Sequence, residues 1–420
     1  MGKMYAKRLA ASGMKKICVC DRFERYEALK EEMKGVPNIQ VLKDGHQVSR
    51  ISDFIIYSVE AEFISQVVKT YGPLTTEGQP LVIIQHRAPD DKVRVVEKIL
   101  ESFKSRYVYL TYEEHDLVTA NTQAVTHAAF LSMGTAWKNS QDYPWETERY
   151  VGGIEIVKIN IALRIYSNKW HVYAGLAILN PSAREQIRMY AQCATDIFKL
   201  MIEEKKDVLR ERMYAAREGV FGWTRQQEGD DVVDATTTSI KQRKPILLSD
   251  RILDQFSLGP KPEPGEPVRP NSHLSLLAMV DCWHKLGIKP YDHLDVAGTP
   301  VFMLWIGVAE YLFRSTSRLE MAVDCAIKDK THRSDDTEFV VAARGWSQCV
   351  SFGSFDLYRS RFEETASFFA PRFQEATVIG GKMIKTILDE SAQVKAAAEA
   401  RAATQAVSAA SNATSDKTSV

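Results

Sequence analysis

The stretch from Tyr107 to Trp137 turns from the pattern of a strand into that of a long helix, and so divides the chain in two. Residues 107–111 are mainly β-branched or aromatic, which suits a buried strand. An acidic pair follows, where a helix dipole favours negative charge, and the apolar residues after it recur at roughly helical spacing. We therefore predict an α/β domain over 1–111 and an all-α domain over 112–390.

Strand and helix patterns alternate before this junction. The predicted strands are 16–20, 39–42, 54–59, 80–85 and 107–111, and the predicted helices are 1–12, 23–34, 60–71 and 89–104. The run at 54–59 is almost continuously apolar, as in a strand that is buried on both faces of a parallel sheet. Such alternation indicates a doubly wound parallel sheet.

The first helix and strand end at Asp21 and Arg22, a pattern typical of the second half of a dinucleotide-binding βαβ unit. There an acid at the strand tip accepts a hydrogen bond from the ribose, and a neighbouring arginine can hold a 2′-phosphate. A strand and a glycine-rich turn normally precede the helix, and only Gly2 could belong to that turn. We expect an incomplete Rossmann-like sheet. The alternative interpretation of Asp21 and Arg22 is a strand-ending turn with solvated charges.

Composition narrows the class of protein. A chain of 420 residues is longer than one hydrophobic core usually supports, which favours two domains. The charges of 54 basic and 54 acidic residues cancel, and a net charge of zero argues against nucleic acid or an acidic membrane as the main partner. The six cysteines include no CxxC pair, and we interpret them as reduced core residues. No apolar run approaches the ~20 residues that cross a bilayer, and no apolar signal core opens the chain. We expect a cytoplasmic protein with no membrane partner.

Helical patterns dominate after the junction. Residues 152–179 are mixed, with aromatic and basic side chains, and clear helical spacing is seen at 273–286, 299–328 and 336–390. The segment 226–271 is expected to form a flexible insertion, and the Ala- and Ser-rich tail over 391–420 is predicted to be disordered.

Polar residues in and after the junction helix are the candidates for chemistry. Gln123 and His127 lie one helical turn apart, so both point from the same face, toward the strand ends where open α/β sheets bind ligands. A satisfied core histidine is the alternative for His127. Arg164 and Lys169 could bind a carboxylate, or they form a solvated helix face. No HExxH or similar cluster predicts a metal site, and no GxSxG predicts nucleophilic catalysis.

Five long segments carry a family resemblance. They are KDGHQVSRISDFIIYSVEA at 43–61, TEGQPLVIIQHRA at 76–88, VYLTYEEHDLVTANTQAVTHAAFLSMGTAW at 108–137, LRIYSNKWHVYAGLAILNPSA at 163–183 and PNSHLSLLAMVDCWHKLGIKPYDH at 270–293. They resemble the fungal prephenate dehydrogenases, the NADP-dependent enzymes of tyrosine biosynthesis. The resemblance implies oxidative decarboxylation of prephenate to 4-hydroxyphenylpyruvate, with hydride passing to NADP. It also implies a Rossmann domain followed by a helical dimerisation domain, and hence a homodimer.

The resemblance also assigns roles to residues. In this chemistry a histidine polarises the substrate hydroxyl while cations hold two carboxylates. The residues expected at the cofactor are Gly2, Asp21, Arg22, Ser58 and Val59. Those expected at prephenate are Gln123 and His127 as the catalytic pair, with Arg164, Lys169 and His273 as substrate contacts. Bacterial relatives carry an arginine near the position of Gly175, so Arg164 or Lys169 is assigned in its place.

The sequence departs from the family pattern in two places. A first strand and GxGxxG turn do not precede Gly2, and a strand-helix-strand unit ending in HSLHGP is absent between Tyr71 and Gly78. That unit carries the histidine expected to act on the substrate hydroxyl. The sequence is interpreted as an incomplete copy of a working enzyme, or as a protein that does not turn over. The alternatives for its function are an arogenate dehydrogenase, or a non-catalytic homologue that acts through its helical dimerisation domain.

Overall fold

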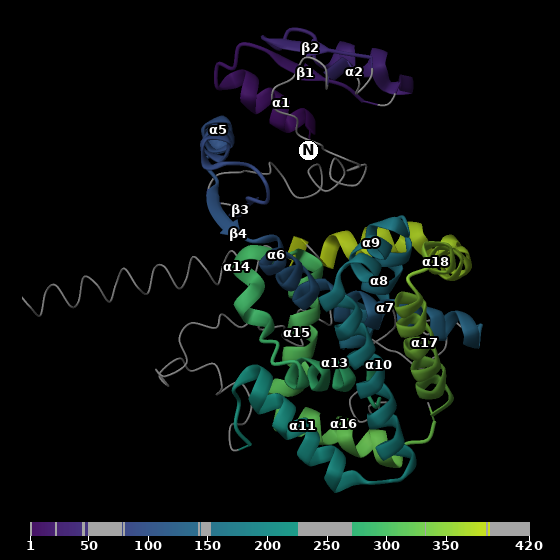
Figure 1. The fold of residues 1–420 in the computed structure, drawn as a ribbon. Helices are drawn as coiled ribbons and strands as arrows, with labels where there is room; N and C mark the ends of the chain where they lie inside the picture. The colour runs from purple at the N-terminus through teal and green to yellow at the C-terminus, as the bar shows by residue number, and fades with distance from the viewer. Residues whose placement is uncertain are drawn as a thin grey trace, which may run out of the picture. The chain divides into compact units, whose positions relative to one another are not determined.

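The computed structural model describes residues 2–21, 23–43, 47–48, 78, 80–141, 143, 153–225, 271–331, 333–383 and 385–386. The predicted strand at 54–59, the helix at 60–71, most of the segment 71–78, the insertion over 226–270 and the tail over 391–420 lie outside these residues. The chain divides into two compact units, Met1–Tyr112 and Glu113–Val420 (Figure 1).

Short strands alternate with helices in the first unit. Its helices are α1 (Gly2–Ala11), α2 (Tyr26–Glu32) and α5 (Asp90–Leu100), with 3-10 turns at Phe23–Arg25 and Glu101–Phe103, and its strands are β1 (Ile17–Val19), β2 (Ile39–Val41), β3 (Pro80–Ile84) and β4 (Arg106–Leu110). Gly13 has a φ of +86°, which residues with a Cβ avoid, and this lets the chain turn from α1 toward β1.

The strands of the first unit pair in parallel, as the alternating pattern predicts. Ile17 of β1 lies opposite Ile39 of β2, and Pro80 of β3 lies opposite Arg106 of β4. Parallel neighbours need a crossover, which α2 and α5 supply. We expected an incomplete Rossmann-like sheet, and within the described residues the two pairs form separate two-stranded sheets. The strand expected at 54–59, which would lie between these pairs in the sequence, falls outside the described part.

An apolar cluster packs α1 against β1. It consists of Ala6, Leu9, Ala10, Ile17 and Phe103. The side chain of Phe103 is 1% exposed, and its ring lies 5.0 Å from that of Tyr5. Phe103 therefore joins the 3-10 turn after α5 to the first helix of the chain.

The cysteines correct one expectation. All six are described and none forms a disulfide, but the interpretation that all are core residues is wrong for three of them. Cys18 and Cys325 are only partly buried, and Cys20 is exposed. The physical reason at Cys20 is that β1 ends at Val19, so the next residue has left the pleated stretch.

The second unit is helical throughout its described residues. Its elements are α6 (Tyr112–Thr119, which begins at the boundary), a π-helical turn (Ala120–Ala124), α7 (Val125–Ser140), α8 (Gly153–Tyr166), α9 (His171–Leu179), α10 (Pro181–Ile202), α11 (Lys206–Phe221), α13 (Leu274–Lys285), a 3-10 turn (Pro290–His293), α14 (Leu294–Ala297), α15 (Pro300–Arg314), α16 (Thr316–Lys328), α17 (Arg333–Phe352), α18 (Phe355–Phe369) and a 3-10 turn (Ala370–Arg372). None of the described helices combines the length and apolar character needed to cross a bilayer.

Two predicted helices are divided because a serine begins a new helix inside each. The Oγ atoms of Ser315 and Ser354 accept hydrogen bonds from backbone N–H groups of α16 and α18 and so cap their N-termini. The helices expected at 299–328 and 336–390 are therefore interrupted. The mixed pattern expected over 152–179 is wrong, since α8 and α9 occupy this stretch.

Helix α7 is the centre of the second unit. From Val125 to Trp137 every residue except His127 is buried, as is typical of a helix that is apolar all round. It packs against α8, α10, α17 and α18 (Figure 1). A Cβ at Gly134 would lie 2.3 Å from Cε2 of Tyr166, so glycine permits the close approach of α8.

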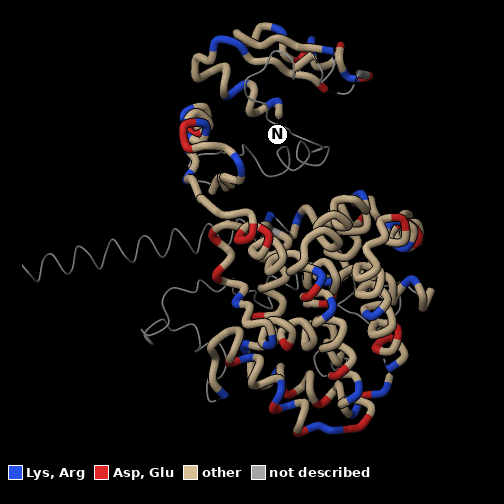
Figure 2. The backbone as a smooth tube through the Cα atoms, viewed as in Figure 1, with Lys and Arg blue, Asp and Glu red and all other residues tan. Residues whose placement is uncertain are grey.

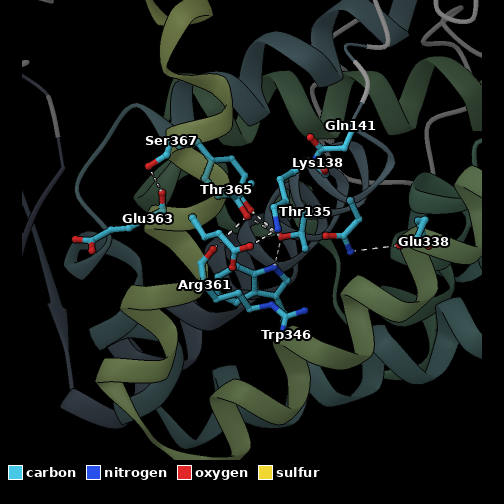
Figure 3. A network of polar contacts seen from close by, with 12 residues as sticks. Thr135, Lys138, Gln141, Glu338, Trp346, Arg361, Glu363, Thr365 and Ser367 are labelled. Atoms are coloured by element: carbon cyan, nitrogen blue, oxygen red, sulfur yellow. Dashed lines mark hydrogen bonds and ion pairs between the residues drawn. The ribbon is translucent and has the colours of Figure 1, made fainter.

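A buried polar network fixes three neighbouring helices to α7 (Figure 3). Trp346 Nε1 of α17 donates to Thr135 Oγ1 at 2.9 Å and to the carbonyl oxygen of Leu131 at 3.2 Å. The Tyr166 hydroxyl of α8 donates to the same carbonyl at 2.7 Å, and Thr365 of α18 lies 3.4 Å from Thr135. Satisfied buried networks select one packing arrangement. The indole of Trp346 is thereby held in a fixed position against α7.

Charges of both signs are interspersed along the helices of the second unit (Figure 2). One ion-pair cluster is partly buried. Arg212 of α11 donates to both carboxylate oxygens of Asp281 of α13, at 2.8 and 2.6 Å, and Lys285 Nζ lies 3.3 Å from the same carboxylate. The Asp281 side chain is 1% exposed, so this bidentate pair ties α11 to α13.

Candidate active site

A small cavity lies beside α7 where five helices meet. It is lined by Ala124, His127, Ala128, Leu131, Tyr173, Leu176, Ala177, Ile187, Trp346, Val350 and Tyr358. These residues come from the π turn and from α7, α9, α10, α17 and α18. Apart from one imidazole, one indole and two phenols, the lining is aliphatic. A mostly apolar lining with a few polar groups is the usual composition of a small-molecule site, but this cavity has a volume of only about 10 Å³, which is room for about one water molecule.

His127 supplies the basic nitrogen of this cavity. Its Nδ1 is buried and has no hydrogen-bond partner among the described residues. Burial lowers the pKa of His127 to about 4, because an apolar surrounding disfavours the charged ring. At neutral pH the imidazole is therefore uncharged and able to accept a hydrogen bond or a proton. A buried polar atom without a partner is rare in folded proteins, and a ligand hydroxyl would complete it.

Tyr173 packs edge-on against His127, with ring centroids 4.8 Å apart. Asn168 Nδ2 donates to the Tyr173 hydroxyl at 2.8 Å. Burial raises the pKa of Tyr173 to about 12, so the phenol keeps its proton. The positive charge of Arg164 opposes this rise, which means that the guanidinium is within electrostatic range of the hydroxyl. Arg164 itself does not line the cavity.

Two other candidates lie close to these residues in sequence. Gln123 is partly buried within the π turn, directly before the cavity residue Ala124. Lys169 is exposed between α8 and α9, where its carbonyl accepts from Val172 N–H, and it does not line the cavity.

His273 belongs to a separate polar cluster. It precedes α13 with a φ of +49°, and its Nδ1 lies 2.9 Å from Glu155 Oε1. Burial would raise the pKa of Glu155, but Lys158, 2.7 Å away, and His273 together lower it to about 2. Ser272 Oγ donates to Asp336 Oδ1 at 2.9 Å, and burial raises the pKa of Asp336 to about 7.

The helix geometry separates this cluster from the cavity. Asp336 and the cavity residue Trp346 both belong to α17. At a rise of 1.5 Å per residue they are about 15 Å apart along the axis. The structure therefore brings His127 and Tyr173 together and holds His273 in contact with Glu155 instead, while Arg164 does not line the cavity.

The cofactor candidates lie in the first unit. Gly2 begins α1, and Asp21 lies two residues after β1, beyond the carboxyl end of a parallel strand, where open α/β sheets bind ligands. Arg25 Nε lies 3.9 Å from Asp21 Oδ2. Arg22, Ser58 and Val59 are outside the described residues. In the described part of the chain no group of three or more His, Cys, Asp or Glu side chains is placed to hold a metal ion.

Two wall residues of the cavity could not be found from the sequence. Trp346 and Tyr358 come from α17 and α18, more than 200 positions after His127, and no local pattern connects them. Tyr173 had a weak signal, because it lies in the aromatic and basic segment that contains Arg164.

Comparison with known proteins identifies the family. Residues 124–389 match a family described as a 6-phosphogluconate dehydrogenase C-terminal domain. The protein of Saccharomyces cerevisiae named prephenate dehydrogenase, NADP(+), is 46% identical over 451 residues, which covers 96% of this chain and 94% of the relative. The chain belongs to the fungal prephenate dehydrogenase family. A second relative, the probable prephenate dehydrogenase, NADP(+), of Schizosaccharomyces pombe, is 44% identical over 431 residues, 93% of this chain and 96% of that protein. No solved structure matches the chain.

Membership in the fungal prephenate dehydrogenases confirms the resemblance found in the sequence segments. The matched C-terminal domain begins at Ala124, inside the π turn, and contains every residue that lines the cavity. The helical unit is thus the family's own domain, and the small parallel sheets of the first unit fit a Rossmann-like domain before it.

Proposed function

We propose that this chain is an NADP-dependent prephenate dehydrogenase, which forms 4-hydroxyphenylpyruvate for tyrosine biosynthesis. The observation that carries the proposal is His127, a neutral imidazole whose buried Nδ1 lacks a partner among the described residues, in a cavity built by the family's domain. Both curated relatives bear this activity in their names, although one is called probable.

The chemistry requires a base and cations for a dicarboxylate. The ring hydroxyl of prephenate loses its proton as hydride leaves the carbon that bears it, and loss of carbon dioxide makes the ring aromatic. His127 is suited to accept a hydrogen bond from that hydroxyl because its imidazole is neutral at physiological pH. Gln123 is proposed as its polar neighbour, and Arg164 as a carboxylate-binding group because a guanidinium pairs with a carboxylate bidentately. Lys169 and His273 stay predictions as further substrate contacts.

The cofactor is proposed to bind in the first unit. NADP+ supplies the hydride acceptor when it is bound. Asp21 at the tip of β1 suits a ribose hydroxyl, and the first turn of α1 at Gly2 suits a phosphate, because N–H groups at a helix start are free to bind anions. Arg22, Ser58 and Val59 are proposed to complete this site.

We also propose the domain roles and the assembly. Residues 1–111 would bind NADP, and residues 112–390 would form the substrate domain and the contact between two copies in a cytoplasmic homodimer. The match of 124–389 to a dehydrogenase C-terminal domain supports this division. Light scattering of the purified chain tests the dimer, and a monomer at micromolar concentration would contradict it.

Absorbance of NADPH, measured with prephenate and NADP+, tests the function. His127→Asn should lower kcat/KM for prephenate by about 10²–10⁴-fold, the usual contribution of a positioned acid or base. His171→Asn, which changes an exposed histidine outside the cavity, is the matched control and should behave like the wild type. Equal activity of the two variants would remove His127 from the mechanism.

Two further comparisons separate the three candidate functions. The first compares this chain with a variant that has the HSLHGP unit inserted between Tyr71 and Gly78, and the second compares prephenate with arogenate as the substrate. Turnover by that protein alone would mark this sequence as an incomplete copy of the enzyme. Oxidation of arogenate but not prephenate would identify the amino acid substrate. NADP binding without turnover in either protein would support the non-catalytic homologue.

A further inference from the structure

Three side chains form a hydrogen-bonded clasp on the π turn beside His127. Gln186 Nε2 of α10 donates to Asn121 Oδ1 at 2.6 Å. Asn121 Nδ2 lies 3.1 Å from Nε2 of His293, which ends the 3-10 turn after α13. The clasp, defined as Asn121, Gln186 and His293, therefore joins three elements that are distant in the sequence.

The bonding pattern fixes the role of each atom. Asn121 Oδ1 already accepts from Gln186, so the Asn121 amide nitrogen is the donor to His293, and Nε2 of that ring is the acceptor. Burial lowers the pKa of His293, which favours the neutral ring and so leaves one ring nitrogen able to accept this hydrogen bond. Gln186 is 5% exposed, and Cys282 Sγ contacts its carbonyl oxygen at 3.8 Å. The clasp is thus anchored in the core on the α10 side.

The π turn determines the direction of the side chains that follow it. A π turn places an extra residue in the helix, so side chains of α7 are rotated relative to those of α6. Ala124, the last residue of the turn, lines the cavity, and His127 follows within the next turn of helix. Without the clasp the helix could relax toward regular α geometry, and His127 would turn away from Tyr173.

We propose that Asn121, Gln186 and His293 are positioning residues that hold the π turn so that His127 faces the cavity. They act on the reaction through His127 and do not line the cavity themselves. The catalytic consequence rests on the function proposed above, whereas the geometric consequence does not.

Two substitutions at one position separate the hydrogen bond from the bulk of the ring. His293→Leu removes the acceptor for the Asn121 amide, and His293→Gln keeps an acceptor oxygen. Thr195→Val is the matched control, because it removes a side-chain hydrogen bond of 2.8 Å to Ala191 O on the same helix as Gln186 but outside the clasp. Gln186→Met removes the donor at the other end of the clasp and repeats the test if His293→Leu does not fold.

The first readout is the pKa of His127, which is measured by an NMR pH titration of protein labelled with ¹⁵N-histidine. The signal that is missing in His127→Asn identifies His127. Burial holds this pKa at about 4 in the wild type. We expect His293→Leu to raise it by about one unit or more, because a released turn lets water reach the ring. His293→Gln and Thr195→Val should leave it unchanged. The same pKa in wild type and His293→Leu overturns the inference, as does an equal rise in Thr195→Val or no rescue by His293→Gln.

The second readout is kinetic. His293→Leu should lower kcat/KM for prephenate by about tenfold or more, since misplacement of a reacting group costs rate steeply. The KM for NADP+ should not change, because the cofactor candidates lie in the first unit. Loss of folded protein would also lower the apparent kcat without changing either KM, so each rate is divided by the folded fraction of that variant, measured by circular dichroism. Should the wild type fail to oxidise prephenate, the proposed function falls, and the NMR titration still decides the inference.

Discussion

At the scale of single residues, burial governs protonation in the second unit. His127, His273 and His293 all have a lowered pKa, and the largest cause in each is desolvation. Asp336 shows the opposite sign, since desolvation raises the pKa of a carboxyl group. Because a pKa that differs between folded and unfolded chains makes stability depend on pH, these shifts can be measured by unfolding.

His127→Asn should weaken the loss of stability on acidification. The folded pKa of about 4 lies below the ordinary value of 6.5, so the unfolded state binds more protons between these pH values. Stability therefore falls as the pH drops from 6.5 toward 4. The difference in unfolding free energy between pH 7.5 and 4.5, measured with urea, should be about 2 kcal/mol smaller in the variant. An identical difference in both proteins would mean that His127 is solvated.

Asp336→Asn should stabilise the protein at high pH. The folded pKa of about 7 lies above the ordinary value of 3.8, so the folded state binds more protons, and stability falls as the pH rises through this window. Asparagine stays neutral and keeps an oxygen that can accept from Ser272. We expect a gain about 2 kcal/mol larger at pH 8 than at pH 5 in urea unfolding. Asp335→Asn is the control, and an equal gain there would locate the effect elsewhere.

The residues of the site differ in how far the sequence could predict them. Gln123 and His127 follow from helical spacing, which is local information. The wall residue Trp346 does not, because it reaches the cavity only after α17 packs on α7. The contact of His273 with Glu155 also depends on packing, since no spacing rule connects a side chain of α8 with one that precedes α13.

At the scale of elements, the local sequence pattern predicts whether a segment is a helix or a strand better than it predicts where that element is interrupted. Each strand or helix predicted before the junction is present if its residues are described by the structure. The ends of these elements differ from the predicted ends by up to four residues. The π turn was not predicted, because an average spacing of apolar residues absorbs one extra residue. Serine caps divided two helices because cap chemistry, unlike periodicity, depends on a single residue.

Asn180 offers a test of cap chemistry. Its Oδ1 accepts from the N–H groups of Ser182 and Ala183 at the start of α10, and its Nδ2 donates to the carbonyl of Asp116 in α6 at 2.8 Å. Asn180→Ala should lower the unfolding free energy by about 2 kcal/mol, the sum of a lost cap and a lost buried bond. Asn180→Asp keeps the cap and should lose about half as much. A loss below about 0.5 kcal/mol in Asn180→Ala would show that water replaces the amide.

At the scale of the whole molecule, the two units offer separate readouts. The seven tryptophans all follow residue 113, so tryptophan fluorescence reports on the second unit alone. Phe103 is a buried member of the apolar cluster that packs α1 against β1 in the first unit. Phe103→Ala should destabilise the first unit by about 3 kcal/mol, the typical cost of such a cavity.

Urea unfolding followed by two probes tests this separation. Circular dichroism should show an early transition in Phe103→Ala, whereas the midpoint from fluorescence should stay at its wild-type value. Coincident shifts of both probes would mean that the units unfold together.

The contact of Gly134 with Tyr166 has a consequence for how such sequences diverge. A methyl group at position 134 would strike the Tyr166 ring, whose hydroxyl is bonded to Leu131 and Thr135 on the same helix. Neither position can therefore change alone without disturbing the wall of the cavity. Relatives that have a larger residue at the position of Gly134 should carry a smaller residue at the position of Tyr166. The two positions are therefore expected to covary.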